Sequence, residues 1–177
     1  MNKLYKIFLT INATSWVIVI YGIKEEWTIA HLPTWVFSIL LLLAPIFMSG
    51  ISVFLTLFLG KDFVENCDEV EEANSTFLPV YLCYFFVGLG IDKCHHLIFI
   101  YLIIFIFTYV AQASYFNPIF LLFGYHFYKV KTTTGTKIFL IVRENIRRVS
   151  EVNLFNLRRI NNNTFISWRN RNESINS

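Results

Sequence analysis

Three consecutive residues, Cys94, His95 and His96, are of the types that most often bind transition metals in proteins. Neighbouring side chains on a helix diverge by about 100°, so three in succession cannot all reach one ion. No further ligand follows at a spacing typical of zinc sites. The other two cysteines, Cys67 and Cys83, form no CxxC pair and are expected to be free thiols. We therefore expect two histidines at the membrane interface and no metal site.

Carboxylates gather in residues 61–76, which we call the acidic segment. It contains one lysine, Lys61, and six acidic residues: Asp62, Glu65, Asp68, Glu69, Glu71 and Glu72. The D-x-D-x-D-G pattern of a calcium loop is missing. Like charges at this density favour contact with water, so the pattern predicts a solvated loop or a short surface helix.

Sequence motifs of catalysis are missing from the chain. It has no GxSxG elbow, no Walker loop and no HExxH helix, and no two carboxylates share an apolar segment. Lys6 is the only ionisable residue other than histidine inside an apolar segment, whereas ion pathways normally need buried charges. We expect that the chain is not an enzyme and that it holds no cofactor.

Composition indicates a membrane protein. Of the 177 residues, 55% are hydrophobic and 15% are charged, against about 25% charged in soluble domains. Residues 97–116 carry no charge, and twenty residues of helix reach about 30 Å, the thickness of the hydrocarbon core. The sequence predicts four spans, at about residues 4–23, 34–59, 76–92 and 97–116. These form a membrane all-α four-helix bundle, residues 1–118.

Three features of these segments leave alternatives open. The first segment also fits a cleaved signal peptide, although polar residues interrupt it. The second contains Pro45, which predicts a kink, and the run Ser49-Gly50-Ile51-Ser52, small enough to let another helix approach closely. The third is short and fits a re-entrant hairpin as well as a span. A short span is accommodated more easily beside other helices, so we expect a homo-oligomer.

Residues 119–177 predict a small C-terminal cytoplasmic β-rich domain. Two β-prone runs, 125–131 and 137–143, flank a five-residue connection that contains Gly135, as a hairpin requires. Runs 152–160 and 164–168 are further candidate strands, around the turn-forming residues 161–163. The Asn117-Pro118 pair is expected to end the last span.

Positive charges give the orientation. With the N-terminus inside, thirteen Lys and Arg lie on the cytoplasmic side and two, Lys24 and Lys93, on the other. We therefore expect a multi-pass protein with both termini in the cytoplasm.

Two basic pairs, Arg147-Arg148 and Arg158-Arg159, are candidates for a partner interface. Three interpretations remain open. The arginines contact anionic lipid, pair with the acidic segment, or dock a cytoplasmic protein through their planar, multi-donor guanidinium groups.

A longer motif runs from Phe116 to Val130, Phe-Asn-Pro-Ile-Phe-Leu-Leu-Phe-Gly-Tyr-His-Phe-Tyr-Lys-Val. Together with the four-span layout, it resembles KwaA, the membrane subunit of the bacterial anti-phage system Kiwa. The resemblance implies a homo-oligomeric sensor in the bacterial inner membrane, such as a tetramer. The sensor would act with a cytoplasmic, nucleic-acid-binding effector like KwaB, without binding nucleic acid itself. The alternatives are a small oligomeric channel or transporter accessory protein, and a structural membrane anchor.

Overall fold

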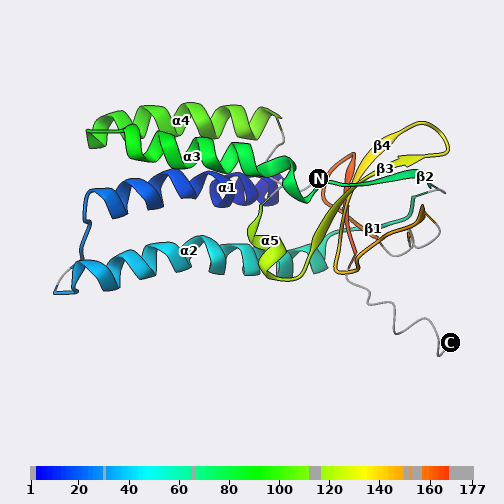
Figure 1. The fold of residues 1–177 in the computed structure, drawn as a ribbon, viewed down its shortest axis with the longest axis horizontal. Helices are drawn as coiled ribbons and strands as arrows, with labels where there is room; N and C mark the ends of the chain where they lie inside the picture. The colour runs from blue at the N-terminus through cyan, green and yellow to red at the C-terminus, as the bar shows by residue number, and fades with distance from the viewer. Residues whose placement is uncertain are drawn as a thin grey trace. The chain divides into compact units, whose positions relative to one another are not determined.

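The computed structural model describes residues 3–29, 31–64, 67–111, 117–149, 152 and 157–167. The chain divides into two compact units, shown in Figure 1. Residues 2–52 and 77–117 make up one unit, which we call the helical unit. Residues 53–76 and 118–177 belong to the other, which we call the sheet unit.

Among its described residues, the helical unit contains four helices: α1 (Lys3–Lys24), α2 (Thr34–Leu55), α3 (Leu78–Gly90) and α4 (Cys94–Ala111). The first packs along both α3 and α4. Their shared core contains Val17, Tyr21, Tyr84, Ile91 and Leu97. Gly88 permits the close approach of α3, because a Cβ there would lie 2.9 Å from the Cβ of Ile20 on α1.

The helix α2 is held differently. Within the described part of the chain, its backbone makes no approach to another helix comparable to that of α1 with α3 or α4. The small residues Ser49 and Ser52 therefore do not serve close helix packing here, and their buried side chains form hydrogen bonds instead. Pro45 lies inside the helix, and η1 (Thr56–Phe58) continues it.

Three helical segments are long and apolar enough to cross a membrane: Lys3–Lys24, Thr34–Phe58 and Cys94–Ala111. They coincide with the first, second and fourth predicted spans. The third predicted span is α3, which has 13 residues and falls short of that length. The fourth helix begins earlier than the predicted start at residue 97, because Cys94, His95 and His96 form the first turn of α4. Residues 112–116, predicted to end the fourth span, lie outside the described residues.

The sheet unit contains a mixed six-stranded sheet with the order β1-β5-β6-β4-β3-β2. Its strands are β1 (Lys61–Asp62), β2 (Cys67–Glu72), β3 (His126–Thr132), β4 (Lys137–Val142), β5 (Leu157–Arg159) and β6 (Thr164–Ile166). Only the β4–β6 pairing is parallel among the described strands. The predicted hairpin is confirmed as β3 and β4, joined by a turn in which Gly135 has φ of 82°.

A hydrophobic core cluster of this unit lies on one face of the sheet, and Phe127, Ile141 and Ile166 are buried on the other. Tyr128, Val130, Leu140, Leu157 and Phe165 are among the buried members of the cluster. Before β3, the short helix α5 (Ile119–Leu122) stacks Phe120 on Phe127, with ring centroids 6.3 Å apart. Gly124, at φ of 75°, supplies the left-handed residue that turns the chain from α5 into β3.

The prediction for the acidic segment was wrong. Residues 61–62 and 67–72 are strands of the sheet and not a solvated loop or surface helix. The reason is that β2 pairs with β3, which places Glu69 opposite Lys131 and Glu71 opposite Lys129. Opposite charges across a strand pair stabilise a segment that would repel itself in isolation. The sheet therefore draws on residues before the predicted domain boundary at 118 as well as after it. Glu65 lies outside the described residues.

Candidate functional site

Three buried polar side chains meet inside the helical unit, and we call Asn12, Ser49 and Asn117 the polar cluster. Asn12 and Ser49 are fully buried and Asn117 is 1% exposed. The Nδ2 atoms of both asparagines donate to Ser49 Oγ, at 2.9 Å from Asn12 and 2.8 Å from Asn117. Ser49 in turn donates to the carbonyl of Pro45 at 2.7 Å. One hydroxyl thus uses its proton and both lone pairs, which fixes all three side chains.

Further hydrogen bonds surround the polar cluster. The Tyr5 hydroxyl on α1 donates to the carbonyl of Ser52 on α2 at 3.1 Å, and Ser52 Oγ donates to the carbonyl of Ser49 at 2.7 Å. The side-chain oxygen of Asn12 is buried and has no hydrogen-bond partner among the described residues. The contacts between α1 and α2 therefore include specific polar bonds, with one acceptor left unsatisfied.

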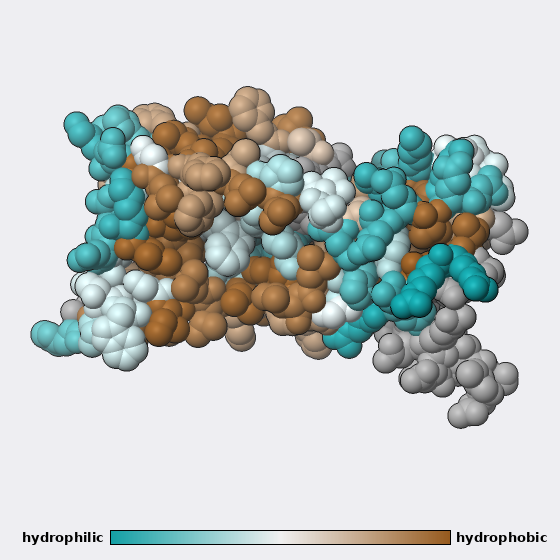
Figure 2. All heavy atoms as spheres, viewed as in Figure 1, coloured by the Kyte–Doolittle hydropathy of each residue, from teal (hydrophilic) through white to brown (hydrophobic). Residues whose placement is uncertain are grey.

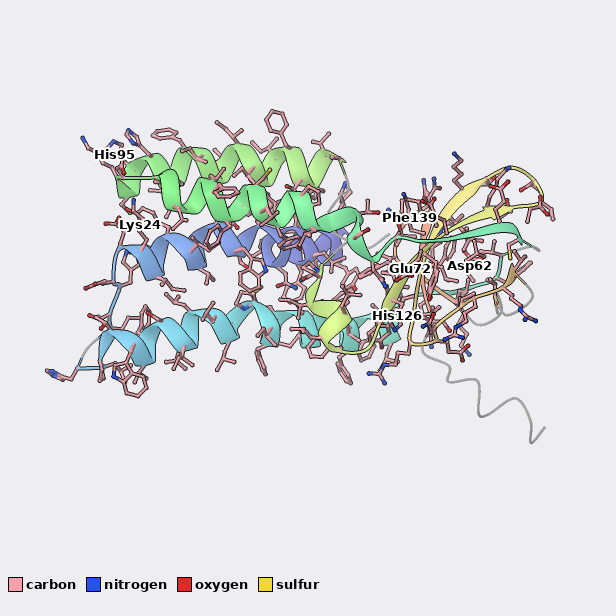
Figure 3. All side chains as sticks on the ribbon, in the orientation of Figure 1. Lys24, Asp62, Glu72, His95, His126 and Phe139 are labelled. Carbon is pink, nitrogen blue, oxygen red and sulfur yellow. The ribbon has the colours of Figure 1, made fainter. Side chains whose placement is uncertain are left out.

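At one end of the helical unit, Lys24 at the end of α1 binds the connection between α3 and α4. Its Nζ donates to the carbonyl of Ile91 at 2.7 Å and lies 3.5 Å from the carboxylates of Glu25 and Asp92. Figure 3 shows His95 at the same end of the helices. His95 and His96 are exposed, with ring centroids 4.2 Å apart. No group of three or more metal ligands occurs among the described residues.

Charged side chains line the β2–β3 pair of the sheet unit. Lys131 Nζ lies 2.8 Å from Glu69 Oε1, and Lys129 Nζ lies 4.0 Å from Glu71 Oε1. The hydrogen bond to Lys131 lowers the pKa of Glu69, and the same bond raises the pKa of Lys131. Pairing with the acidic segment, which the sequence leaves open for the arginines, therefore also involves these lysines.

Beside this strand pair, Asn74 joins the edge of the sheet to His126, which Figure 3 labels together with Glu72. The Asn74 amide donates to Glu72 Oε1, lies 3.3 Å from His126 Nδ1 and accepts the backbone N–H of Phe127 at 2.8 Å. These bonds anchor the end of β2 to the start of β3.

The second basic pair has a structural role. Arg158 Nη1 donates to the carbonyl of Leu59 at 2.8 Å. The guanidinium of Arg159 lies 3.5 Å from Asp62 and also donates to the backbone of Asn161 and the side chain of Asn162. Both arginines are on β5, which pairs with β1. Pairing with the acidic segment is thus shown for Arg159.

The first basic pair lies on the segment between β4 and β5, where Arg147 and Arg148 are both exposed. The preceding residue is fixed, because the N–H of Ile146 donates to the Tyr128 hydroxyl at 2.9 Å. That hydroxyl donates to Asn145 Oδ1 at 3.3 Å. The two exposed arginines therefore follow a residue whose backbone is held in place by a hydrogen bond.

The comparison with known families covers almost the whole chain. The family model described as "Anti-phage protein KwaA" matches residues 5–166. No curated protein and no solved structure matches the chain. Because the match spans both units, the chain belongs to the KwaA family of anti-phage proteins.

Proposed function

We propose that this anti-phage protein is an integral membrane subunit of the Kiwa system, which senses infection and recruits or controls a cytoplasmic effector. The observation that carries the membrane assignment is the apolar exterior of α2 and α4. Phe47, Phe107 and Val110 are each more than two thirds exposed. Figure 2 shows hydrophobic residues over much of the helical unit. A surface of this kind is stable against lipid and aggregates in water.

The proposed orientation follows the positive charges. Lys24 lies at the end of the helical unit that carries His95, while ten Lys and Arg follow residue 117. Cytoplasmic segments carry the excess of Lys and Arg in inner-membrane proteins. The sheet unit then faces the bacterial cytoplasm, where a soluble effector of the KwaB type is accessible.

Arg147 and Arg148 are the better candidates for the effector interface. Replacing Arg158 and Arg159 would disturb the β1–β5 pairing, because both lie on β5 and bond to Leu59 and Asp62. Exposed arginines on an anchored backbone are favoured at protein interfaces. The proposed partner is a protein, and nucleic acid binding is left to the effector.

Co-purification from membranes tests the proposal. The chain is co-expressed with a soluble effector of the KwaB type, solubilised, and captured by an affinity tag. The double change Arg147→Glu/Arg148→Glu should lose the effector and the protection against phage while the protein still inserts. A matched control, Lys61→Glu/Lys137→Glu, alters the net charge equally at two exposed positions on β1 and β4 and should retain both.

Two results would contradict this proposal. Extraction of the unaltered protein by alkaline carbonate would show that it is not integral to the membrane. Effector binding at the unaltered level in Arg147→Glu/Arg148→Glu would remove these arginines from the interface.

A small oligomeric channel is the second candidate, and the polar cluster inside the helical unit is the observation that favours it. Polar side chains inside a bundle are what a pore needs, but the hydrogen bonds of this cluster are largely internal and none of its three residues is ionisable, so the channel ranks second. Ion conductance by the purified protein in planar bilayers would support the channel.

A further inference from the structure

We infer that the polar cluster is a latch that holds α2 against α1, and that its opening is how the helical unit signals to the sheet unit. The latch itself is argued from hydrogen bonds and burial within the helical unit. Its signalling part rests on the proposed sensing function. The two parts are therefore tested by separate measurements.

The first argument is that α2 is the helix most easily displaced. Helices α1, α3 and α4 pack closely around a shared core, whereas α2 contacts α1 through long side chains such as Tyr5 and Asn12. Ser49 accepts the bond from Asn12 and the backbone of Ser52 accepts the bond from Tyr5, while Ser49 accepts a further bond from Asn117, which lies after α4. Losing a few hydrogen bonds would release α2 without disrupting the core of the other three helices.

The second argument concerns the flexibility of α2. Pro45 lacks a backbone N–H, so one carbonyl in the preceding turn loses its helical partner. Beyond it, Ser49 and Ser52 donate their hydroxyls to carbonyls four and three residues earlier. Serine bonds of this type bend helices. The second half of α2 is therefore able to change its direction at the position where the polar cluster holds it.

The third argument is the place of the polar cluster along the chain. The helical unit ends at Ser52 within α2, and it ends again at Asn117, directly before Pro118. Ser49 and Asn117 thus lie on two of the segments that lead into the sheet unit, and they are bonded to each other at 2.8 Å. Opening this bond frees the two segments to move independently.

The fourth argument is that the closed latch leaves one buried hydrogen-bond acceptor without a donor among the described residues. The Oδ1 atom of Asn12 is buried without a hydrogen-bond partner among the described residues. A buried acceptor without a donor keeps its full desolvation cost. A displacement of α2 that lets a donor reach Asn12 recovers that cost and offsets part of the loss of the broken hydrogen bonds.

Spin-label distances between α1 and α2 test the latch. Labels at Ile11→Cys and Ile51→Cys, two exposed positions, are placed in a full-length chain whose native cysteines are replaced by serine. With the protein in lipid nanodiscs, Ser49→Ala removes the shared acceptor and should lengthen and broaden the distance distribution. The matched control is Ser38→Ala, because Ser38 is also on α2 and bonds within its own helix, to the carbonyl of Thr34.

A second variant keeps the test informative if Ser49→Ala does not fold. Asn117→Ala leaves the bond between Asn12 and Ser49 in place and should give an intermediate distribution. Unaltered distributions in both variants would overturn the latch.

Effector co-purification and phage protection in the same variants test the signalling part. A changed distribution accompanied by altered effector binding or protection supports it, and a changed distribution with both readouts unaltered overturns it. Loss of effector binding in every form, including the unaltered chain, would contradict the proposed function while leaving the distance measurement valid.

Discussion

Glu69 and Lys131 lie opposite each other in the β2–β3 register and form the shortest ion pair among the described residues. The pKa of Glu69 is lowered, so its contribution to stability is present above its ordinary pKa of about 4.3 and is lost as the pH falls through the folded value. The pKa of Lys131 is raised, so its contribution is present below about 10.4 and is lost as the pH rises through the folded value. The pair therefore stabilises the sheet between about pH 5 and pH 10.

We predict that Lys131→Met lowers the thermal midpoint of the sheet unit at pH 7, and that this difference shrinks at pH 4 and in high salt. The effect should be small, because both side chains are largely exposed to water. Lys137→Met is the control. Lys137 is directly opposite Lys131, so the repulsion that its removal relieves should offset the loss of its attraction for Glu69, which is weaker than that of Lys131. An equal loss in both variants would contradict a role for the ion pair.

Single residues of the polar cluster show what the sequence could reveal and what it could not. Asn12 stands out as a polar interruption of an apolar segment, and such residues normally face a partner inside the bundle. Its acceptor, Ser49, is 37 positions away along the chain, and Asn117 lies a further 68 beyond. Periodicity identifies the buried face of one helix, but it does not specify which residue of another segment lies opposite.

At the scale of elements, local signals were sufficient for the β3–β4 hairpin and insufficient for β2. The hairpin is encoded by two β-prone runs and a glycine between them, all within 17 residues, His126–Val142. The strand β2 is acidic at four of its six positions, and its stability depends on lysines about sixty residues later. The sequence also predicted free thiols, and Cys67, Cys83 and Cys94 are free.

The α1–α3 packing gives a prediction about an element. Gly88→Ala would place a Cβ 2.9 Å from Ile20 Cβ and 3.1 Å from the carbonyl of Val17, both on α1. We expect α3 to be forced outwards, at a cost of about 1–3 kcal/mol in the free energy of unfolding. Gly90→Ala is the matched control, because nothing lies within 4 Å of its Cβ position. Thermal unfolding in detergent measures both, and equal midpoints would contradict the close packing.

For the molecule as a whole, we predict self-association through the helices. Large apolar side chains on α2 such as Trp35 and Phe47 are exposed, and α3 is short for a lone span. Mass photometry of detergent-solubilised protein should give a mass above that of one 20.8 kDa chain. A monomer that persists across several mild detergents would count against a homo-oligomer. Phe47→Ser should shift the distribution towards smaller species, whereas the exposed Phe99→Ser on α4 should leave it unaltered.

Membrane topology is tested by labelling single cysteines. The native Cys67 is unsuitable for this test. Burial raises the pKa of the Cys67 thiol, and its Sγ lies 3.7 Å from the carbonyl of Val149. Slow labelling of Cys67 would therefore not report its side of the membrane. The exposed Cys94 is suitable, and His31→Cys and Thr133→Cys add exposed positions between α1 and α2 and on the β3–β4 turn.

In chains that retain one cysteine each, an impermeant maleimide should label Cys94 and His31→Cys in intact spheroplasts, and Thr133→Cys only after lysis. This pattern follows from four crossings with the N-terminus inside, as the positive charges favour. Labelling of Thr133→Cys alone would show the opposite orientation. Labelling of Thr133→Cys together with His31→Cys, with Cys94 protected, would show that α3 enters and leaves on the same side, and it would contradict the β2–β3 pairing, which needs residues 67–72 and 126–132 on one side of the membrane. Each topology thus gives a different combination of labelled positions, and only the first places the sheet unit where it can meet a cytoplasmic effector.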